Sequence, residues 1–435
     1  MSMLDINYIR ANQPKVEAAA TNKGYDPALV SSVLTLDDSR RALVSQIDAL
    51  RAERNQNSAA MKSGKPDQTL IDRGKQIKVE LSKLESELNS LDDEYFAKLK
   101  QIPNVPTDDV PVGLTEDDNV VTETIGEQTK FDFKPKNHYE LAVERGWLDK
   151  ERAAKVAGSR FTYVMSDMVK LQLAIMTFVI NSLSDEDIIK DITAKAGLDI
   201  STRPFIPVLP PYMIKTELYD AMDRLEPRED RYKIDGDELW LQGSAEHVLG
   251  SMHADEIFEE KDLPLRYLGY ATSFRQEAGT YGKDMEGIIR MHQFDKLEME
   301  SFTTAENGLD EHLFFVAVQR YLLESFKLPY RVLQKCTWDI GKPNARGVDM
   351  EVWLPGQDKY RETHTADYMT DYQARRLKTR VRRKDGTVEL IYTNDATAFA
   401  LGRIMIAIIE NYQTADGKVV VPEVLRPYLG GRTEL

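Results

Sequence analysis

Arginine, glutamate and aromatic side chains recur at short intervals between residues 266 and 299, in RYLGYATSFRQEAGTYGKDMEGIIRMHQFDKLEM. The pattern predicts a strand, a glycine-containing loop and a returning strand. Because residues two apart share a face of an extended strand, Arg275 and Glu277 are expected on one face. The same spacing on the returning strand groups Arg290, His292, Phe294, Lys296 and Glu298. A half-buried sheet is usually aliphatic, so a surface this polar needs a ligand or water to satisfy it.

These residue types suit a nucleotide. An arginine fork matches a phosphate or a carboxylate, an aromatic ring can stack on adenine, and a glutamate can accept a hydrogen bond from an exocyclic amine. The alternative is an exposed antiparallel hairpin held together by ion pairs. The pattern by itself leaves both interpretations open.

A second chemically suggestive segment is Ala400-Leu401-Gly402-Arg403, which precedes an apolar helix predicted over Ile404 to Ile409. A helix of that composition is mostly core. An arginine in its first turn faces away from the core, so we expect Arg403 to have a functional role.

Long helices are predicted at the other end of the chain, from Leu36 to about Ile102, where the composition is rich in helix formers. Apolar residues in the second half alternate steps of four and three, which places them along one seam of a supercoiled helix. They are Ile77, Leu81, Leu84, Leu88, Leu91, Tyr95 and the neighbouring Leu99, with Leu43, Ile47 and Leu50 upstream. Gly64 and Pro66 separate the two seams, so we predict an antiparallel helical hairpin.

The tip of this hairpin is predicted to be basic. Seven basic and three acidic residues between Arg51 and Lys78 give +4, on a chain whose net charge is -15. The basic residues are Arg51, Arg54, Lys62, Lys65, Arg73, Lys75 and Lys78. Such a tip suits a phosphate backbone, because lysine and arginine displace counterions from a polyanion. A solvated coiled coil that docks a protein partner fits the charges equally well.

The proline-containing stretch from Ile102 to Val112 reads as a linker, so we expect a helical domain over residues 1–104 and a mixed α+β domain over residues 105–435. The negative net charge argues against non-specific coating of nucleic acid, DNA included. No membrane span and no secretory signal are predicted, and a cytoplasmic location is expected. The one cysteine, Cys336, cannot form an internal disulfide and is expected to be a packing residue.

Several ordered motifs resemble those of one enzyme family. Phe274-Arg275-Gln276-Glu277 resembles the arginine and glutamate signature of class II aminoacyl-tRNA synthetases, and IIRMHQFDKLEM is similar to the seryl-tRNA synthetase form of the following segment. The similarity continues through MLDINYIRANQPKV, the helical arm, GSRF, PVLPP, KYRE, DYQARR, ENYQ and VPEVLRPYLGG, which together span nearly the whole chain.

The resemblance implies a class II fold, an antiparallel sheet flanked by helices, and a homodimer whose interface includes Met168 to Leu183 and Pro210. It also implies an activity with ATP and Mg²⁺, in which L-serine is activated to seryl-adenylate and transferred to serine tRNA, with selenocysteine tRNA as a further possibility. The arm would recognise the long variable arm of serine tRNA.

Residue roles follow from the same resemblance. Arg275, Glu362 and Arg403 are implied as catalytic, and Glu362 and Thr365 as magnesium ligands. The implied ATP site consists of Arg275, Gln276, Glu277, Arg290, Met291, Phe294, Glu362, Thr363, His364, Thr365 and Arg403. The implied serine site consists of Ser244, Ala245, Glu246, Arg275, Glu298, Asp395 and Thr397. The basic residues of the hairpin tip are implied to bind tRNA.

Two segments depart from the family pattern near the amino-acid pocket. Residues 363–368 read Thr-His-Thr-Ala-Asp-Tyr where the family has a run rich in serine and cysteine. Asp395-Ala396-Thr397 stands where asparagine, glycine and serine are usual. These changes either alter fidelity against threonine or repack the pocket, and we favour repacking, because one methyl group gives weak discrimination. No zinc is assigned to His292 or His364, since isolated histidines are more often structural.

Three other functions are compatible with such a chain. One is a catalytically silent paralogue that binds tRNA or a protein through the arm, although it would have no chemical reason to keep the site's charged residues. Another is a ligase that loads a different amino acid. A third is a ligase that loads a carrier protein, which the arm disfavours.

Overall fold

The computed structural model describes residues 4–63, 68–278 and 287–435. The chain divides into two compact units, Met1–Val105 and Pro106–Leu435. The predicted turn residues Gly64 and Pro66 lie outside the described residues. Within the described ranges, no helix combines the length and apolar character that crossing a membrane requires.

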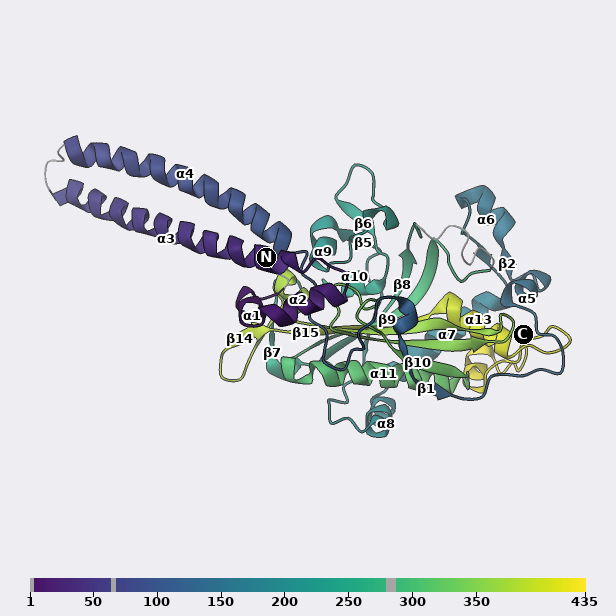
Figure 1. Cartoon of the computed structure of the whole chain (residues 1–435). Coiled ribbons are helices and arrows are strands. Elements are labelled where there is room, and N and C mark those ends of the chain that lie inside the picture. Colours follow the sequence, from purple (N-terminus) through teal and green to yellow (C-terminus); the bar gives the residue numbers. More distant parts are fainter. Residues whose placement is uncertain (1–3, 64–67, 279–286) are drawn as a thin grey trace. The chain divides into compact units, whose positions relative to one another are not determined.

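The first unit is helical, as its composition predicts (Figure 1). Its helices are α1 (Ile6–Ala11), α2 (Gln13–Asn22), α3 (Ala28–Ser63) and α4 (Gln68–Leu99). Helices α3 and α4 pack against each other along the predicted seam, where Ile47, Ile77 and Leu81 are buried. The predicted helical hairpin is therefore confirmed, and it arises because apolar residues at heptad spacing can leave water only against a second helix.

The second unit is built around one large sheet in which all neighbouring strands but one pair are antiparallel. In spatial order its strands are β1 (Val120–Ile125), β10 (Tyr330–Gln334), β11 (Arg346–Leu354), β12 (Lys359–Thr370), β15 (Tyr392–Ala400), β9 (Gln293–Thr303), β8 (Leu265–Phe274) and β4 (Ile206–Val208). Strand β4 runs parallel to β8 and forms one edge. The α+β class II architecture predicted from the sequence is confirmed.

Smaller strands and helices surround this sheet. The small sheets consist of β2 (Leu148–Asp149) with β3 (Tyr163–Val164), β5 (Met213–Lys215) with β6 (Leu239–Leu241), and β7 (Ile257–Glu259) with β13 (Arg380–Arg382) and β14 (Val388–Leu390). The helices are α5 (His138–Glu144), α6 (Lys150–Ala157), α7 (Asp167–Leu183), α8 (Glu186–Ala196), α9 (Thr216–Ala221), α10 (Ala245–Gly250), α11 (Gly308–Ser325), α12 (Tyr372–Leu377) and α13 (Leu401–Asn411).

The two faces of the large sheet differ in polarity. The main apolar core includes Met299 on β9, Ala366 on β12 and Ala396 on β15, together with residues of α7, α11 and α13. Their neighbours along each strand point to the other face, because side chains alternate in a strand. That second face carries polar residues, among them Glu298 and Asp395. Helix α10 contacts β8 and β9.

Cys336 is buried, as expected for a packing residue.

Candidate active site

The predicted strand, loop and strand is present, but both strands are shorter than the polar pattern suggested. Strand β8 ends at Phe274 and β9 begins at Gln293. Arg275, Glu277, Arg290 and His292 therefore lie in the connection, and the expectation that strand alternation orients these four was wrong. Glu277 has a φ of +52°, a left-handed conformation in which alternation does not apply. Phe294, Lys296 and Glu298 do lie on β9, as predicted.

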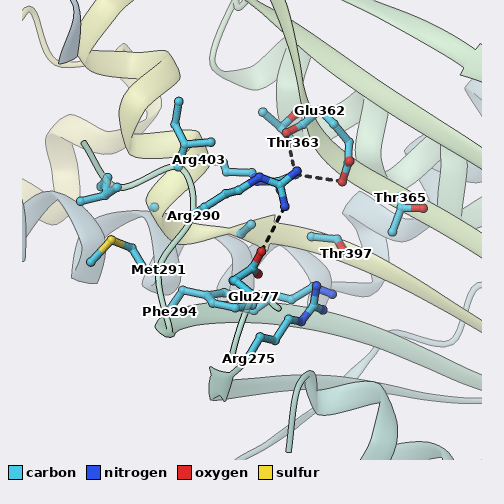
Figure 2. A pocket seen from close by; sticks show the side chains of 15 residues that line it. Arg275, Glu277, Arg290, Met291, Phe294, Glu362, Thr363, Thr365, Thr397 and Arg403 are labelled. Atoms are coloured by element: carbon cyan, nitrogen blue, oxygen red, sulfur yellow. Dashed lines mark hydrogen bonds and ion pairs between the residues drawn. The ribbon is translucent and has the colours of Figure 1, made fainter. Parts of the chain in front are cut away.

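Side chains of the connection between β8 and β9 nevertheless line one cavity. Figure 2 shows Arg275, Glu277, Arg290, Met291 and Phe294 converging from it and from the start of β9. Two hydrogen bonds fix the loop ends: Arg275 N donates to His292 O at 3.0 Å, and the ring nitrogen Nδ1 of His292 donates to Arg275 O at 2.9 Å. His292 is thus a structural residue.

Arg290 and Arg403 each contact a carboxylate at this cavity. Arg290 Nη1 donates to Glu277 Oε2 at 3.1 Å. Arg403, in the first turn of α13, donates from Nη1 to Glu362 Oε1 and to Glu362 O, both at 2.9 Å. Desolvation at the cavity raises the pKa of Glu362, whose side chain is 48% exposed, but the charges of Arg403 and Lys335 outweigh this effect and hold the pKa below its ordinary value.

A β-bulge brings Glu362 and Thr365 to the same cavity. Residues three apart lie on opposite faces of a regular strand. On β12 the register shifts between Met350 and Glu351 of the partner strand, so that Glu362 faces Glu351 while His364 faces Met350. Thr363 is the extra residue of the bulge, and Glu362, Thr363 and Thr365 all line the cavity.

Helix α11 supports this arrangement from the core side. Gln319 Nε2 donates to Thr365 O at 2.7 Å and to Thr397 O at 2.9 Å, which ties β12 to β15 at the level of the site. Thr397 also lines the cavity.

Two residues that the resemblance assigned to the ATP site do not line the cavity. His364 is buried, its ring packs on Phe399 with centroids 5.1 Å apart, and burial lowers its pKa to about 3. Gln276 is exposed and its Nε2 donates to Arg231 O at 2.8 Å.

A buried acidic cluster lies on the same sheet face, next to the cavity. One carboxylate oxygen each from Glu246, Glu298 and Asp395 falls within 4.8 Å of the others. Ser244, at the start of α10, donates from Oγ to Glu298 Oε2 at 3.3 Å and accepts from Lys296 Nζ at 3.1 Å. Lys296 also forms an ion pair with Glu298.

The remaining residue of the predicted serine site, Ala245, packs in an apolar cluster with Leu249 and Ala271. Arg275 borders both parts of the site: its Cζ lies 5.3 Å from the Phe294 ring centroid, and its Nε donates to Gly243 O at 2.9 Å. A wider cleft of about 790 Å³ runs past Arg275, Glu246 and Glu362, so one ligand could reach all three.

Sequence reasoning missed some residues of the site. Lys296 was placed on the correct strand face but was given no role, although the alternation had singled it out. Ile288 lines the cavity without a local pattern that marks it. Ala400 and Gly402 also line it, although only Arg403 of their segment was expected to have a role. Arg224, which contacts Glu246 and Asp395, comes from a loop far along the chain and had no sequence signal.

The predicted tRNA-binding residues lie along α3 and α4. Arg73 donates to Glu53 from Nε at 2.6 Å and from Nη2 at 2.7 Å, and Arg51 donates to Glu85 at 2.9 Å, so part of this charge joins the two helices. Lys75 contacts Asp72 at 3.6 Å. Arg54, Lys62 and Lys78 are exposed. Lys65 lies outside the described residues.

The fold and the convergent arginines and carboxylates define a class II aminoacyl-tRNA synthetase. Residues 230–412 match the tRNA synthetase class II core domain (G, H, P, S and T), and residues 3–106 match the seryl-tRNA synthetase N-terminal domain. The chain belongs to the seryl-tRNA synthetase family.

Individual relatives agree over the full length. The serine–tRNA ligases of Pseudothermotoga lettingae and Nitratidesulfovibrio vulgaris are each 38% identical, the first over 98% of this chain and 99% of the relative, the second over 99% of both. The crystal structure of seryl-tRNA synthetase from Pyrococcus horikoshii complexed with ATP superposes with a TM-score of 0.89 at 35% identity, covering 99% of both chains. The cytoplasmic serine–tRNA ligase from Naegleria fowleri in complex with AMP gives 0.85 at 28% identity, covering 99% of this chain and 98% of that one.

Proposed function

We propose that this protein activates L-serine with ATP to give seryl-adenylate and transfers the seryl group to serine tRNA. One observation supports the proposal: Arg275, Glu362 and Arg403, from three separate segments, line one cavity, and Glu298 lies in the acidic cluster beside it. The family membership and the ATP and AMP complexes of the two similar structures support it.

In the first step an oxygen of the serine carboxylate attacks the α-phosphorus of ATP, and the bond to the β-phosphate oxygen breaks to release pyrophosphate. No protein nucleophile is needed. The chain contributes positioning and neutralisation of charge that develops at phosphorus. Arg275 binds the α-phosphate and the serine carboxylate, Arg290 and Arg403 bind the outer phosphates, and Phe294 stacks on adenine while Glu277 accepts from its amine.

Serine itself is held by the acidic cluster. Glu246 and Ser244 bind the ammonium group, and Glu298 accepts a hydrogen bond from the hydroxyl. In the second step a ribose hydroxyl at the end of the tRNA attacks the seryl carbonyl and AMP leaves.

The donor set at Glu362 fits Mg²⁺. Carboxylate and hydroxyl oxygens are the ligands this ion prefers, and it is usually bound by one or two carboxylates together with substrate phosphates. Glu362 and Thr365 would hold the ion, and Asp349 lies directly opposite Thr365 in the sheet. When bound, the ion neutralises charge on the phosphates.

The arm supplies the tRNA contact in this proposal. Residues 1–104 bind the long variable arm of serine tRNA through the basic tip, residues 105–435 catalyse, and the protein works as a cytoplasmic homodimer. The exposed side chains of Arg54, Lys62 and Lys78 support this assignment.

The test is amino-acid-dependent exchange of pyrophosphate into ATP, measured with serine, threonine, alanine and glycine. Serine should support exchange far better than the other three. Exchange with a different amino acid alone would replace the substrate assignment, and tRNA binding without any exchange would favour the silent paralogue. Aminoacylation of a carrier protein without tRNA would favour the carrier ligase.

A further inference from the structure

Arg224 contacts the acidic cluster from a loop that follows α9. Its Nε lies 2.8 Å from Glu246 Oε1, in a charge contact without an aligned hydrogen bond. Its Nη2 donates to Asp395 Oδ2 at 3.4 Å and to Asn344 Oδ1 at 3.2 Å. The side chains are largely or fully buried, with 15% of Arg224, 12% of Glu246 and 1% of Asp395 exposed.

No other lysine or arginine of the described chain forms an ion pair with Glu246. His247 Nε2 lies 3.4 Å from the same carboxylate, but burial lowers the pKa of His247 to about 4, so the imidazole is neutral at pH 7. Lys296 is engaged with Glu298. Burial raises the pKa of Glu246, but the charged guanidinium of Arg224 outweighs this effect, holds the pKa well below its ordinary value and keeps the carboxylate ionised.

The cluster contains a fourth buried carboxyl group, Glu300, which lies opposite Asp395 in the sheet register. Burial and the neighbouring charge of Asp395 raise the pKa of Glu300 well above its ordinary value, and burial also raises that of Asp395. Arg224 lies beside Asp395, whereas neither Glu300 oxygen has a hydrogen-bond partner among the described residues.

The contacts of the cluster pair acidic with basic side chains. Arg224 contacts Glu246 and Asp395, and Lys296 pairs with Glu298. Carboxyl groups outnumber basic side chains here, which suits a ligand that carries an ammonium group. A free oxygen of Asp395, Oδ1, is buried without a hydrogen-bond partner in the described structure and belongs to the same cluster.

We propose that Arg224 is a positioning and specificity residue of the amino-acid pocket: it holds Glu246 and Asp395 side by side, so that together they face the substrate ammonium. The proposal rests on the proposed function, because it takes the acidic cluster as the amino-acid site. It also explains how an aspartate occupies position 395, where the family usually has a neutral asparagine.

A purely structural role for Arg224 makes a different prediction. As a buried link between its own loop, α10 and β15, Arg224 would affect stability and both substrates alike. A positioning role affects serine selectively. The two are separated by measuring KM for serine and KM for ATP in pyrophosphate exchange, with the full-length protein.

The experiment compares wild type with Arg224→Met, Arg224→Lys, Asp395→Asn and the double variant R224M/D395N. Arg224→Met should raise the KM for serine at least 30-fold and change the KM for ATP less than threefold. Arg224→Lys should recover only part of the loss, because an ammonium cannot contact both carboxylates as a planar fork does. The double variant should bind serine better than R224M, because it no longer buries an uncompensated Asp395.

Arg376→Met is the matched control. Arg376 is also a buried arginine between two carboxylates, Asp220 at 2.5 Å and Asp223 at 3.7 Å, and it does not line the cleft. The Arg376→Met variant should have a lower Tm but no selective change in the KM for serine. Equal changes in both KM values for R224M, or strictly additive effects of R224M and D395N, would overturn the inference. Absence of serine-dependent exchange in the wild type would instead overturn the proposed function.

Discussion

Glu362 combines two properties at the residue scale: its carboxylate lines the cavity and it contacts Arg403. If it binds Mg²⁺ beside the phosphates, Glu362→Gln should lower kcat for pyrophosphate exchange about 100-fold or more, the size expected when one preorganised charge contact is lost. The variant should also need a higher Mg²⁺ concentration for half-maximal rate. Both are read from exchange assays at varied Mg²⁺.

Glu423→Gln is a suitable control for that measurement, because Glu423 is an exposed glutamate that pairs with Lys327 outside the cleft. It should leave the Mg²⁺ dependence unchanged. An unchanged dependence in Glu362→Gln as well would remove Glu362 from the metal site.

Glu298 gives the site a pH dependence. Burial raises its pKa to about 7, against the lowering effect of Lys296. If the ionised form accepts the serine hydroxyl, as proposed, a proton must leave Glu298 below pH 7 before serine binds. The KM for serine should therefore rise as the pH falls below 7, by up to about tenfold per unit, and level off above it. Exchange assays between pH 6 and 8 at saturating ATP check this, and a flat KM would contradict it.

The helices and strands of the site could be predicted from local pattern to different extents. The seam of apolar residues at heptad spacing, which includes Ile47, Ile77 and Leu81, was enough to predict helices α3 and α4. Alternation placed Phe294, Lys296 and Glu298 on one face of β9. It failed at Glu277, where a left-handed residue follows the strand end, and it could not place Glu362 with Thr365, because a bulge depends on pairing with β11.

The arm makes a prediction at the scale of a whole element. Replacing Arg54, Lys62 and Lys78 by alanine should raise the KM for tRNA about tenfold or more, because each lost phosphate contact lowers affinity, and it should weaken the salt dependence of binding. Pyrophosphate exchange without tRNA should stay at the wild-type level. Aminoacylation at several salt concentrations measures the first effect.

A matched variant replaces three exposed lysines of the second unit, Lys190, Lys195 and Lys327, and loses the same net charge. It should charge tRNA like the wild type. An equal loss in both variants would mean that overall charge, and not the arm, governs tRNA binding.

At the scale of the whole molecule, the proposed amino-acid pocket depends on pairings that no local pattern reveals. Ser244 meets Glu298 across 54 positions, and Arg224 meets Asp395 across 171. Periodicity indicates on which face of its strand a residue lies. Which residues of different strands then become neighbours depends on the order of the strands in the sheet. The family motifs pointed to Glu246 and Asp395 as candidate site residues, while Arg224 became apparent only from its contacts.

Association of two copies is the remaining expectation at this scale. Several apolar side chains on and near β4 and α7 are exposed, with exposed fractions of 48% for Ile206, 80% for Leu209, 39% for Val169 and 49% for Leu173. Strand β4 is also an edge of the large sheet, with backbone groups available for pairing. Pro210, expected in the interface, is itself buried within the chain, whereas Leu209 beside it is exposed.

Such surface favours burial against a second copy. The wild type should therefore have twice the mass of the 49.6 kDa chain in light scattering after size-exclusion chromatography. L173E combined with L209E should shift the mass to that of one chain, because two buried charges on each copy oppose association. Val388→Glu, at a 43% exposed position on β14, should remain dimeric. A dimer that survives the double substitution would place the contact elsewhere on the surface.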